Sequence, residues 1–219
     1  MSAARDTTRL RQEIIRTCRL LRNRGYFIGT WGNVAVRVEE GLLVTPTRLS
    51  YDALRPADLV VVSEDGKRVK GERFPSSETG LHRLILRRRP EAGASLHTHS
   101  PYASSVAALR LTIPALTEEM SQILGGQVRC SRYVPAGRHA DFAAAVGKAL
   151  GPGVNAVLVA NHGAVVVGSD LAEAVAAAEV LEKAALIFVH AKAAGKPHAI
   201  PSSLVREERD RFLHKYGKE

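Results

Sequence analysis

The stretch Asn33-Val-Ala-Val-Arg-Val-Glu-Glu-Gly-Leu-Leu-Val-Thr45 predicts the first two strands of a β-sheet. Valines stand at alternate positions 34, 36 and 38, which is the period of a half-buried β-strand. Leu42 to Thr45 follow a short Glu-Glu-Gly link, so we expect them to form the hairpin partner of that strand. The pair predicts an antiparallel start to the sheet.

Further apolar runs and amphipathic periods predict the remaining elements. Strands are expected at 59–63, 94–99, 128–133, 156–160 and 164–167. Helices are expected at 7–24, from Ser76 to before Pro90, from Pro101 onward, and at 117–124, 139–150, 170–194 and 202–216. Strands and helices do not alternate regularly, so a mixed or largely antiparallel sheet is favoured over a Rossmann sheet. No linker or repeat interrupts the chain, and we predict one α/β domain over 1–219.

Composition limits the class of protein. The chain has 219 residues, of which 45% are hydrophobic, and no apolar run approaches the roughly 18 residues of a membrane span. The N-terminus lacks the apolar core of a signal peptide. Cys18 and Cys130 lie far apart and outside any CxxC pair, so we expect a cytoplasmic protein without a disulfide framework.

The formal net charge of +9 does not by itself predict a nucleic-acid partner. The basic clusters at 9–24 and 87–89 fall on predicted helices, and no aromatic residues interleave with them as in a base-stacking surface. We interpret them as solvated helix faces and expect no binding to nucleic acid or membranes. The positive field can still steer a phosphorylated substrate.

His97-Thr98-His99 places two imidazoles at i and i+2 in the run ASLHTHS (94–100). On a strand, alternation sends both rings to the same face. Neutral imidazole is the commonest protein ligand for zinc-like ions, so the pair is half of a metal site. The competing interpretation is two surface or hydrogen-bonded histidines, and further ligands must decide between them.

Two residues are candidates to complete that site. His162 stands in an Asn-His-Gly turn between two predicted strands, and Gly163 lets the backbone turn sharply. Glu78 lies in the first turn of a predicted helix, where the helix N-terminus favours its charge. Taken singly, these would be a turn residue and a helix-terminal charge. The remaining histidines have no such pairing and are predicted to be structural or at the surface: His82, His139, His190, His198 and His214.

Hydroxyl and amide groups near Glu78 predict an anion site. Ser76 and Ser77 directly precede a helix, where hydroxyls and free backbone N–H groups converge, although simple N-capping would explain the same pair. Asn33 ends a Gly-containing turn that can close around a phosphate, or is merely part of a tight loop. Thr47 offers a further hydroxyl, and Arg48 can pair with phosphate directly.

Five motifs occur together in an order that resembles the class II aldolase/adducin superfamily, in the pattern of the L-fuculose-1-phosphate aldolases. They are GTWGNVAVR (29–37), LLVTPT (42–47), FPSSETGLH (74–82), LHTHS (96–100) and LVANHG (158–163). The resemblance implies a three-layer α/β/α subunit around a mostly antiparallel sheet. It also implies a homotetramer of four-fold symmetry with active sites at subunit interfaces.

The resemblance also implies a role for each matching residue. Zinc would be bound by Glu78, His97, His99 and His162, and manganese or cobalt suits the same ligands. The substrate phosphate would be held by Asn33, Thr47, Ser76 and Ser77. Tyr216, in the terminal Lys-Tyr-Gly, matches a tyrosine that reaches a neighbouring subunit's site.

The implied reaction is cleavage of a ketose 1-phosphate, such as L-fuculose 1-phosphate or a 5-deoxypentulose 1-phosphate. Its products are dihydroxyacetone phosphate and a short aldehyde. Glu78, released from the metal, would act as the proton shuttle. Zinc would stabilise the charge of the enediolate.

Three departures from the family pattern concern the substrate. Arg48 stands where the family usually has glycine, and Ala136 stands where it has an aromatic residue. A family tyrosine is missing from Leu-Thr-Glu-Glu-Met (116–120), where Glu118 or Glu119 lies instead. Glu119-Met120 also resembles the acid/base glutamate of methylthioribulose-1-phosphate dehydratases, so dehydration of a 1-phosphoketose is the main competing reaction.

The candidate metal ligands argue against an epimerase and against a non-catalytic scaffold. A 4-epimerase of the superfamily typically has aspartate where Glu78 stands. An adducin-like scaffold would have lost metal ligands, whereas this chain keeps all four candidates. Both functions are therefore less favoured than the aldolase.

Overall fold

The computed structural model describes residues 7–215, and the strands within that range form one sheet. The strand order is β4-β3-β2-β1-β5-β7-β6, and every neighbouring pair is antiparallel. The strands are β1 (Asn33–Val38), β2 (Gly41–Val44), β3 (Val60–Val62), β4 (Arg68–Lys70), β5 (Ala94–Thr98), β6 (Ala156–Val159) and β7 (Gly163–Gly168). The predicted antiparallel sheet and the β1–β2 hairpin are confirmed.

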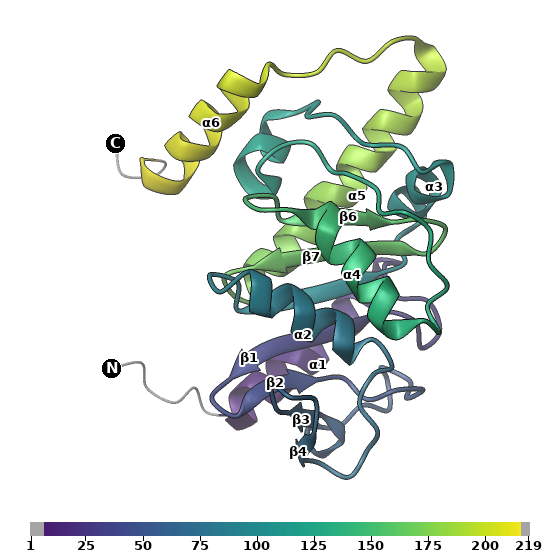
Figure 1. Cartoon of the computed structure of the whole chain (residues 1–219), viewed down its shortest axis with the longest axis vertical. Coiled ribbons are helices and arrows are strands. Elements are labelled where there is room, and N and C mark those ends of the chain that lie inside the picture. The colour runs from purple at the N-terminus through teal and green to yellow at the C-terminus, as the bar shows by residue number, and fades with distance from the viewer. Residues whose placement is uncertain (1–6, 216–219) are drawn as a thin grey trace.

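Helices cover both faces of the sheet, which gives the predicted α/β arrangement (Figure 1). One face packs against α1 (Thr7–Asn23), α3 (Pro101–Leu109) and α5 (Leu171–Ala194). The other face packs against α2 (Thr79–Arg88) and α4 (His139–Leu150). Alternation decides the side: Val34 and Val36 of β1 belong to the first core, and Ala35 between them belongs to the second.

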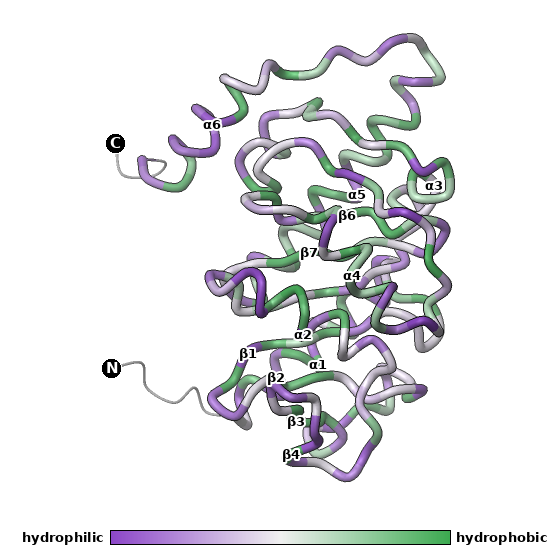
Figure 2. The backbone as a smooth tube through the Cα atoms, in the orientation of Figure 1, coloured by the Kyte–Doolittle hydropathy of each residue, from purple (hydrophilic) through white to green (hydrophobic). Residues whose placement is uncertain are grey.

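The last helix, α6 (Ser202–His214), lies at the periphery beyond a connecting segment (Figure 1). It packs against the short helix η2 (Met120–Leu124), where Gln122 donates a hydrogen bond to Glu208 at 2.6 Å. In Figure 2, hydrophilic colour dominates α6, whereas the strands of the sheet are largely hydrophobic. No helix among residues 7–215 is long and apolar enough to cross a membrane.

Three local expectations need correction. Residues 128–133 do not form a strand, because their β-pairing is limited to the isolated bridges Ile113–Val128 and Cys130–Leu158. The Ser131 hydroxyl accepts the N–H of Ala160 at 3.3 Å in place of a main-chain carbonyl, and the ladder ends there. The exposed edge strand β4 has no apolar pattern and was not expected.

The third correction concerns Arg89, which was expected on a solvated helix face. Its side chain is buried and donates hydrogen bonds to the Val154 carbonyl at 2.6 Å and to Asn155 Oδ1 at 3.0 Å. Its charge is also paired with Glu91. Arg89 therefore ties the end of α2 to the segment before β6, whereas Arg87 and Arg88 are exposed as expected.

Candidate metal centre

Three imidazoles converge where β5 ends and β7 begins. The ring centroids of His97 and His99 are 4.7 Å apart, and each lies 4.9 Å from the ring of His162. One ligand nitrogen from each ring can be chosen so that all three lie within 4.8 Å of one another. The structure thus brings together the predicted half-site on β5 and the predicted turn histidine, and the cluster can bind a metal ion.

The orientation of His97 is set from its far side. Its Nδ1 lies 2.9 Å from the Ala164 carbonyl of β7, and a carbonyl can only accept, so Nδ1 carries the hydrogen. The lone pair is left on Nε2, which lies 3.1 Å from Nε2 of His162. This backbone contact fixes the tautomer that a metal ligand needs.

The turn that carries His162 is held in a sharp conformation. Asn161 has a left-handed backbone with φ of 55°, and Arg110 donates a hydrogen bond to its side-chain oxygen at 2.9 Å. A Cβ on Gly163 would collide with the carbonyl oxygen of Thr98, so only glycine lets β7 start this close to β5. Together these contacts bring His162 next to His97.

Glu78 lies at the N-cap of α2 and faces two of the three rings. Its two carboxylate oxygens lie 3.3 Å from Nε2 of His97 and 3.3 Å from Nε2 of His162. The Asn33 amide also donates to it at 2.7 Å. Two ligand atoms about 2.1 Å from an ion at tetrahedral angles are about 3.4 Å apart, so these separations fit a zinc-type donor set.

The electrostatics favour the protonation states that metal binding requires. Burial lowers the pKa of His99 to about 3 and of His162 to about 4, and the neighbouring His97 adds to both shifts. Burial raises the pKa of Glu78, but His97, the Asn33 hydrogen bond and His162 outweigh it and bring the pKa to about 2. At neutral pH His99 and His162 are therefore neutral and Glu78 is ionised, which are the forms that bind a metal ion.

The candidate phosphate residues lie on segments that are bonded to one another. The Ser76 N–H donates to the Thr45 carbonyl and the Thr47 N–H donates to the Phe74 carbonyl, both at 3.0 Å. Ser76 Oγ accepts the N–H of Glu78 at 3.2 Å, whereas Ser77 and Thr47 are exposed. These contacts place the hydroxyl-bearing segments beside the start of α2.

Asn33, also expected at the phosphate, is engaged elsewhere. It uses its amide nitrogen on Glu78 and its amide oxygen on His82, which is 2.5 Å away. The amide nitrogen has a second hydrogen left for another acceptor. The sequence predicted His82 only as a structural or surface residue. The detectable signal was its position four residues after Glu78, on the same face of the helix.

The other expected site residues have contacts of their own, are exposed or lie outside the described residues. The carboxylate of Glu119 accepts a hydrogen bond from the Lys183 ammonium of α5, and that bond lowers the pKa of Glu119 to about 2. Glu118 is exposed, and Ala136 packs against the core beside α2 and α4. Tyr216 lies outside the described residues.

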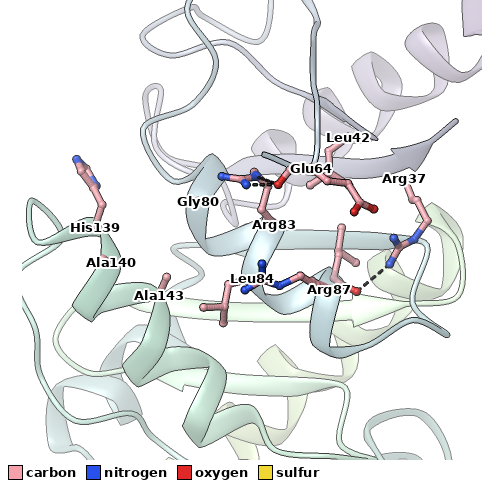
Figure 3. Close-up of a pocket in the computed structure, with 11 residues that line it drawn as sticks. Arg37, Leu42, Glu64, Gly80, Arg83, Leu84, Arg87, His139, Ala140 and Ala143 are labelled. Atoms are coloured by element: carbon pink, nitrogen blue, oxygen red, sulfur yellow. Dashed lines mark hydrogen bonds between the residues drawn. The ribbon is translucent and has the colours of Figure 1, made fainter. Parts of the chain in front are cut away.

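A separate groove of about 380 Å³ lies between α2 and α4 (Figure 3). Arg37 and Arg83 point along its walls but are engaged with main-chain carbonyls, those of Leu86 and Glu64. No candidate ligand of the metal centre lines this groove. It is therefore distinct from the histidine cluster.

An antiparallel α/β fold with three convergent histidines and a carboxylate defines an enzyme scaffold with a candidate metal centre. Residues 12–189 match the sequence profile described as "Class II Aldolase and Adducin N-terminal domain". The chain belongs to the class II aldolase and adducin family, and it is an enzyme of the lyase class.

Individual relatives cover nearly the whole chain. The 5-deoxy-D-ribulose 1-phosphate aldolase of Bacillus thuringiensis is 33% identical over 211 residues, which are 95% of this chain and 97% of that protein. The 5-methylthioribulose-1-phosphate/5-deoxyribulose-1-phosphate aldolase of Rhodospirillum rubrum is 34% identical over 212 residues, covering 94% and 90%. A solved L-fuculose 1-phosphate aldolase superposes with a TM-score of 0.89 at 31% identity, covering 96% of this chain and 98% of that one.

Proposed function

We propose that this protein is a zinc-dependent aldolase that cleaves a ketose 1-phosphate into dihydroxyacetone phosphate and a short aldehyde. The observation that carries the proposal is the contact of Glu78 with both His97 and His162 at 3.3 Å. Glu78 directly follows Ser76 and Ser77 in the sequence. The candidate metal ligands therefore lie next to the candidate phosphate site. The names of the Bacillus and Rhodospirillum relatives favour 5-deoxyribulose 1-phosphate as the first substrate to test.

Each group would have a separate task. His97, His99 and His162 would hold the ion, and zinc, when bound, supplies a Lewis acid for negative charge that develops on substrate oxygens. Ser76, Ser77 and Thr47 would bind the phosphate. Fixing the phosphate fixes the distance from the sugar's reacting carbons to the metal centre, which lowers the entropic barrier.

Glu78 would move the proton. Cleavage of the C3–C4 bond removes a proton from the C4 hydroxyl and must deliver one to C3 of the triose phosphate. Glu78 has one carboxylate oxygen held by Asn33 and lies beside the imidazoles, so it is within reach of a carbon bound there. Its lowered pKa keeps it ionised at neutral pH and able to accept a proton.

We infer further that four copies associate with the sites at their interfaces, as the family resemblance implies. Trp31 and Phe74 support this, since they are 65% and 77% exposed on the loops that carry Asn33 and Ser76. Light scattering is expected to give about four times the chain mass of 23.6 kDa, and a monomer would contradict the inference.

The proposed reaction is tested by incubating purified protein with 5-deoxyribulose 1-phosphate and L-fuculose 1-phosphate. Release of dihydroxyacetone phosphate, followed through its reduction by NADH in a coupled assay, is expected with zinc and not after chelation. The matched control is His198→Ala, an exposed histidine away from the cluster, which is expected to keep full activity. Absence of triose phosphate from every ketose 1-phosphate would refute the proposal.

A parallel incubation with methylthioribulose 1-phosphate separates the aldolase from the dehydratase. Loss of water from methylthioribulose 1-phosphate without triose phosphate would favour the dehydratase, with Glu119 as acid/base. The ion pair with Lys183 holds the Glu119 carboxylate in its ionised form, so Glu119 would enter that reaction as the base.

A further inference from the structure

Four polar side chains form a hydrogen-bonded series that begins in the interior of the protein and ends at Glu78. Ser95 Oγ lies 2.9 Å from His82 Nδ1, and His82 Nε2 lies 2.5 Å from Asn33 Oδ1. Asn33 Nδ2 in turn lies 2.7 Å from Glu78 Oε2. Ser95 and His82 are completely buried. The proposed function uses neither of them.

Three elements bring this series together. Glu78 and His82 are four residues apart at the start of α2, so they lie on one helix face. Asn33 of β1 is paired in register with His97 of β5. Ser95 precedes His97 by two residues and therefore points to the same side of the sheet. The hydrogen-bonded series consequently lies in the layer between α2 and the sheet, next to the histidine cluster.

The direction of every hydrogen bond in the series from Ser95 to Glu78 follows from the Glu78 carboxylate at its end. A carboxylate only accepts hydrogen bonds, so Asn33 must face Glu78 with its NH₂ group and His82 with its oxygen. The amide oxygen also only accepts, so His82 must donate from Nε2. Neutral His82 then has its lone pair on Nδ1, and Ser95 must donate to it. One arrangement of hydrogens satisfies all four groups.

We propose that His82 is a positioning residue, which holds the Asn33 amide with its NH₂ group toward Glu78 and so fixes the Glu78 carboxylate against His97 and His162. Without a donor at His82 Nε2, the amide oxygen of Asn33 would be buried without a partner, and rotation of the amide would place two oxygens against each other. His82 would thereby act on metal binding and catalysis through Asn33, without contact to substrate. This role rests on the proposed function only where turnover is concerned.

The first test uses the metal-free wild-type protein and needs no substrate. Long-range ¹H–¹⁵N spectra of ¹⁵N-histidine-labelled protein report which ring nitrogen carries the hydrogen. We expect His82, assigned by its loss in His82→Gln, to be the neutral Nε2–H tautomer between pH 6 and 8. The Nδ1–H tautomer would overturn the proposal, because its Nε2 has no hydrogen to donate to Asn33.

The second test compares two substitutions at His82 by titrating metal-free protein with Co²⁺ against a competing chelator. His82→Leu removes the donor, and we expect Co²⁺ affinity to fall about tenfold to hundredfold, as for other partners of metal-binding groups. His82→Gln keeps an N–H donor near the position of Nε2, and we expect affinity within about threefold of wild type. Leu81→Val, a buried change on α2 without a polar partner, is the control for packing and is expected to bind as wild type.

Each outcome of the second test decides something. Equal affinity for the Leu and Gln variants would overturn the proposal, whether both are normal or both are weak. If His82→Leu does not fold, the tautomer and the Gln variant still decide. The rate of triose phosphate release should also be lower in His82→Leu than in His82→Gln. The difference should lie mainly in kcat, with KM little changed. If the Co²⁺ and tautomer results hold and no ketose 1-phosphate is cleaved, the proposed function fails and His82 remains a positioning residue for the metal centre.

Discussion

Backbone strain is concentrated in the segments that carry candidate site residues. Within residues 7–215, the non-glycine residues with positive φ are Arg48, Arg110 and Asn161. Arg48 follows Thr47, Asn161 precedes His162, and Arg110 is hydrogen-bonded to Asn161. Each such residue costs roughly 1–2 kcal/mol. Strain of this kind persists where the surroundings hold it, as they do around binding sites.

His97→Ala is expected to abolish stoichiometric zinc binding. It removes the imidazole whose Nε2 faces both His162 and Glu78. The remaining ligands then lack the group that lies next to both of them. Zinc content of the purified variant, measured by elemental mass spectrometry, should fall from about one per chain to near zero. His198→Ala should keep full zinc content. Full zinc content in His97→Ala would exclude this cluster as the metal centre.

The sequence predicted the four residues that meet at this cluster, because each belongs to a short local motif. It did not predict the partners that orient them. His82 has no motif of its own, and its role depends on α2 lying over the paired strands β1 and β5. The Ala164 carbonyl that fixes His97 comes from β7, 67 residues further along the chain. Contacts of that range cannot be obtained from periodicity.

Strand β5 lies between β1 and β7 in the sheet and so connects the elements of the site. In one row across the sheet, Asn33 of β1 pairs with His97 of β5, which pairs with Val165 of β7. The local hairpin β1–β2 was predictable from alternation and a short turn. The insertion of β5 between β1 and β7 was not, because their pairing depends on burial of both faces rather than on any local signal.

Two glycine substitutions should have opposite effects on stability. Gly163→Ala would drive a methyl group into the Thr98 carbonyl and push β7 away from β5, at a cost of about 1–3 kcal/mol. Gly80→Ala, in α2 with open space around the new methyl, should stabilise the protein by about 0.5–1 kcal/mol. Urea unfolding of both variants measures the difference. An unchanged free energy of unfolding for Gly163→Ala would show that the close approach of these strands is not required.

The arginines of the described residues fall into an exposed group and an engaged group, which composition alone could not separate. Some arginines are exposed, as Arg87 and Arg88 are, whereas Arg11 donates to the carbonyls of Pro56 and Leu59 and Arg89 is buried. The net charge of +9 therefore overstates the basic surface available to an anionic polymer. Arg87 and Arg88 agree with the interpretation as solvated helix faces, whereas the buried Arg89 does not.

The metal-free protein is expected to lose stability as pH falls from about 6.5 to about 4. Burial, and then His97, lower the pKa of His82 to about 4. The unfolded chain therefore binds a proton across this range while the native state does not, so the free energy of unfolding decreases as pH falls. For His82 alone the decrease is about 3 kcal/mol, and His99 and His162 act in the same direction.

Urea unfolding of chelator-treated protein at several pH values between 7 and 4 measures this dependence. His82→Gln removes one titrating group, so its free energy of unfolding should fall less steeply with pH than that of wild type, even if it is lower at pH 7. His198→Ala removes an exposed histidine and should leave the slope unchanged. Equal slopes for wild type and His82→Gln would mean that folding does not lower the pKa of His82, which would contradict this prediction.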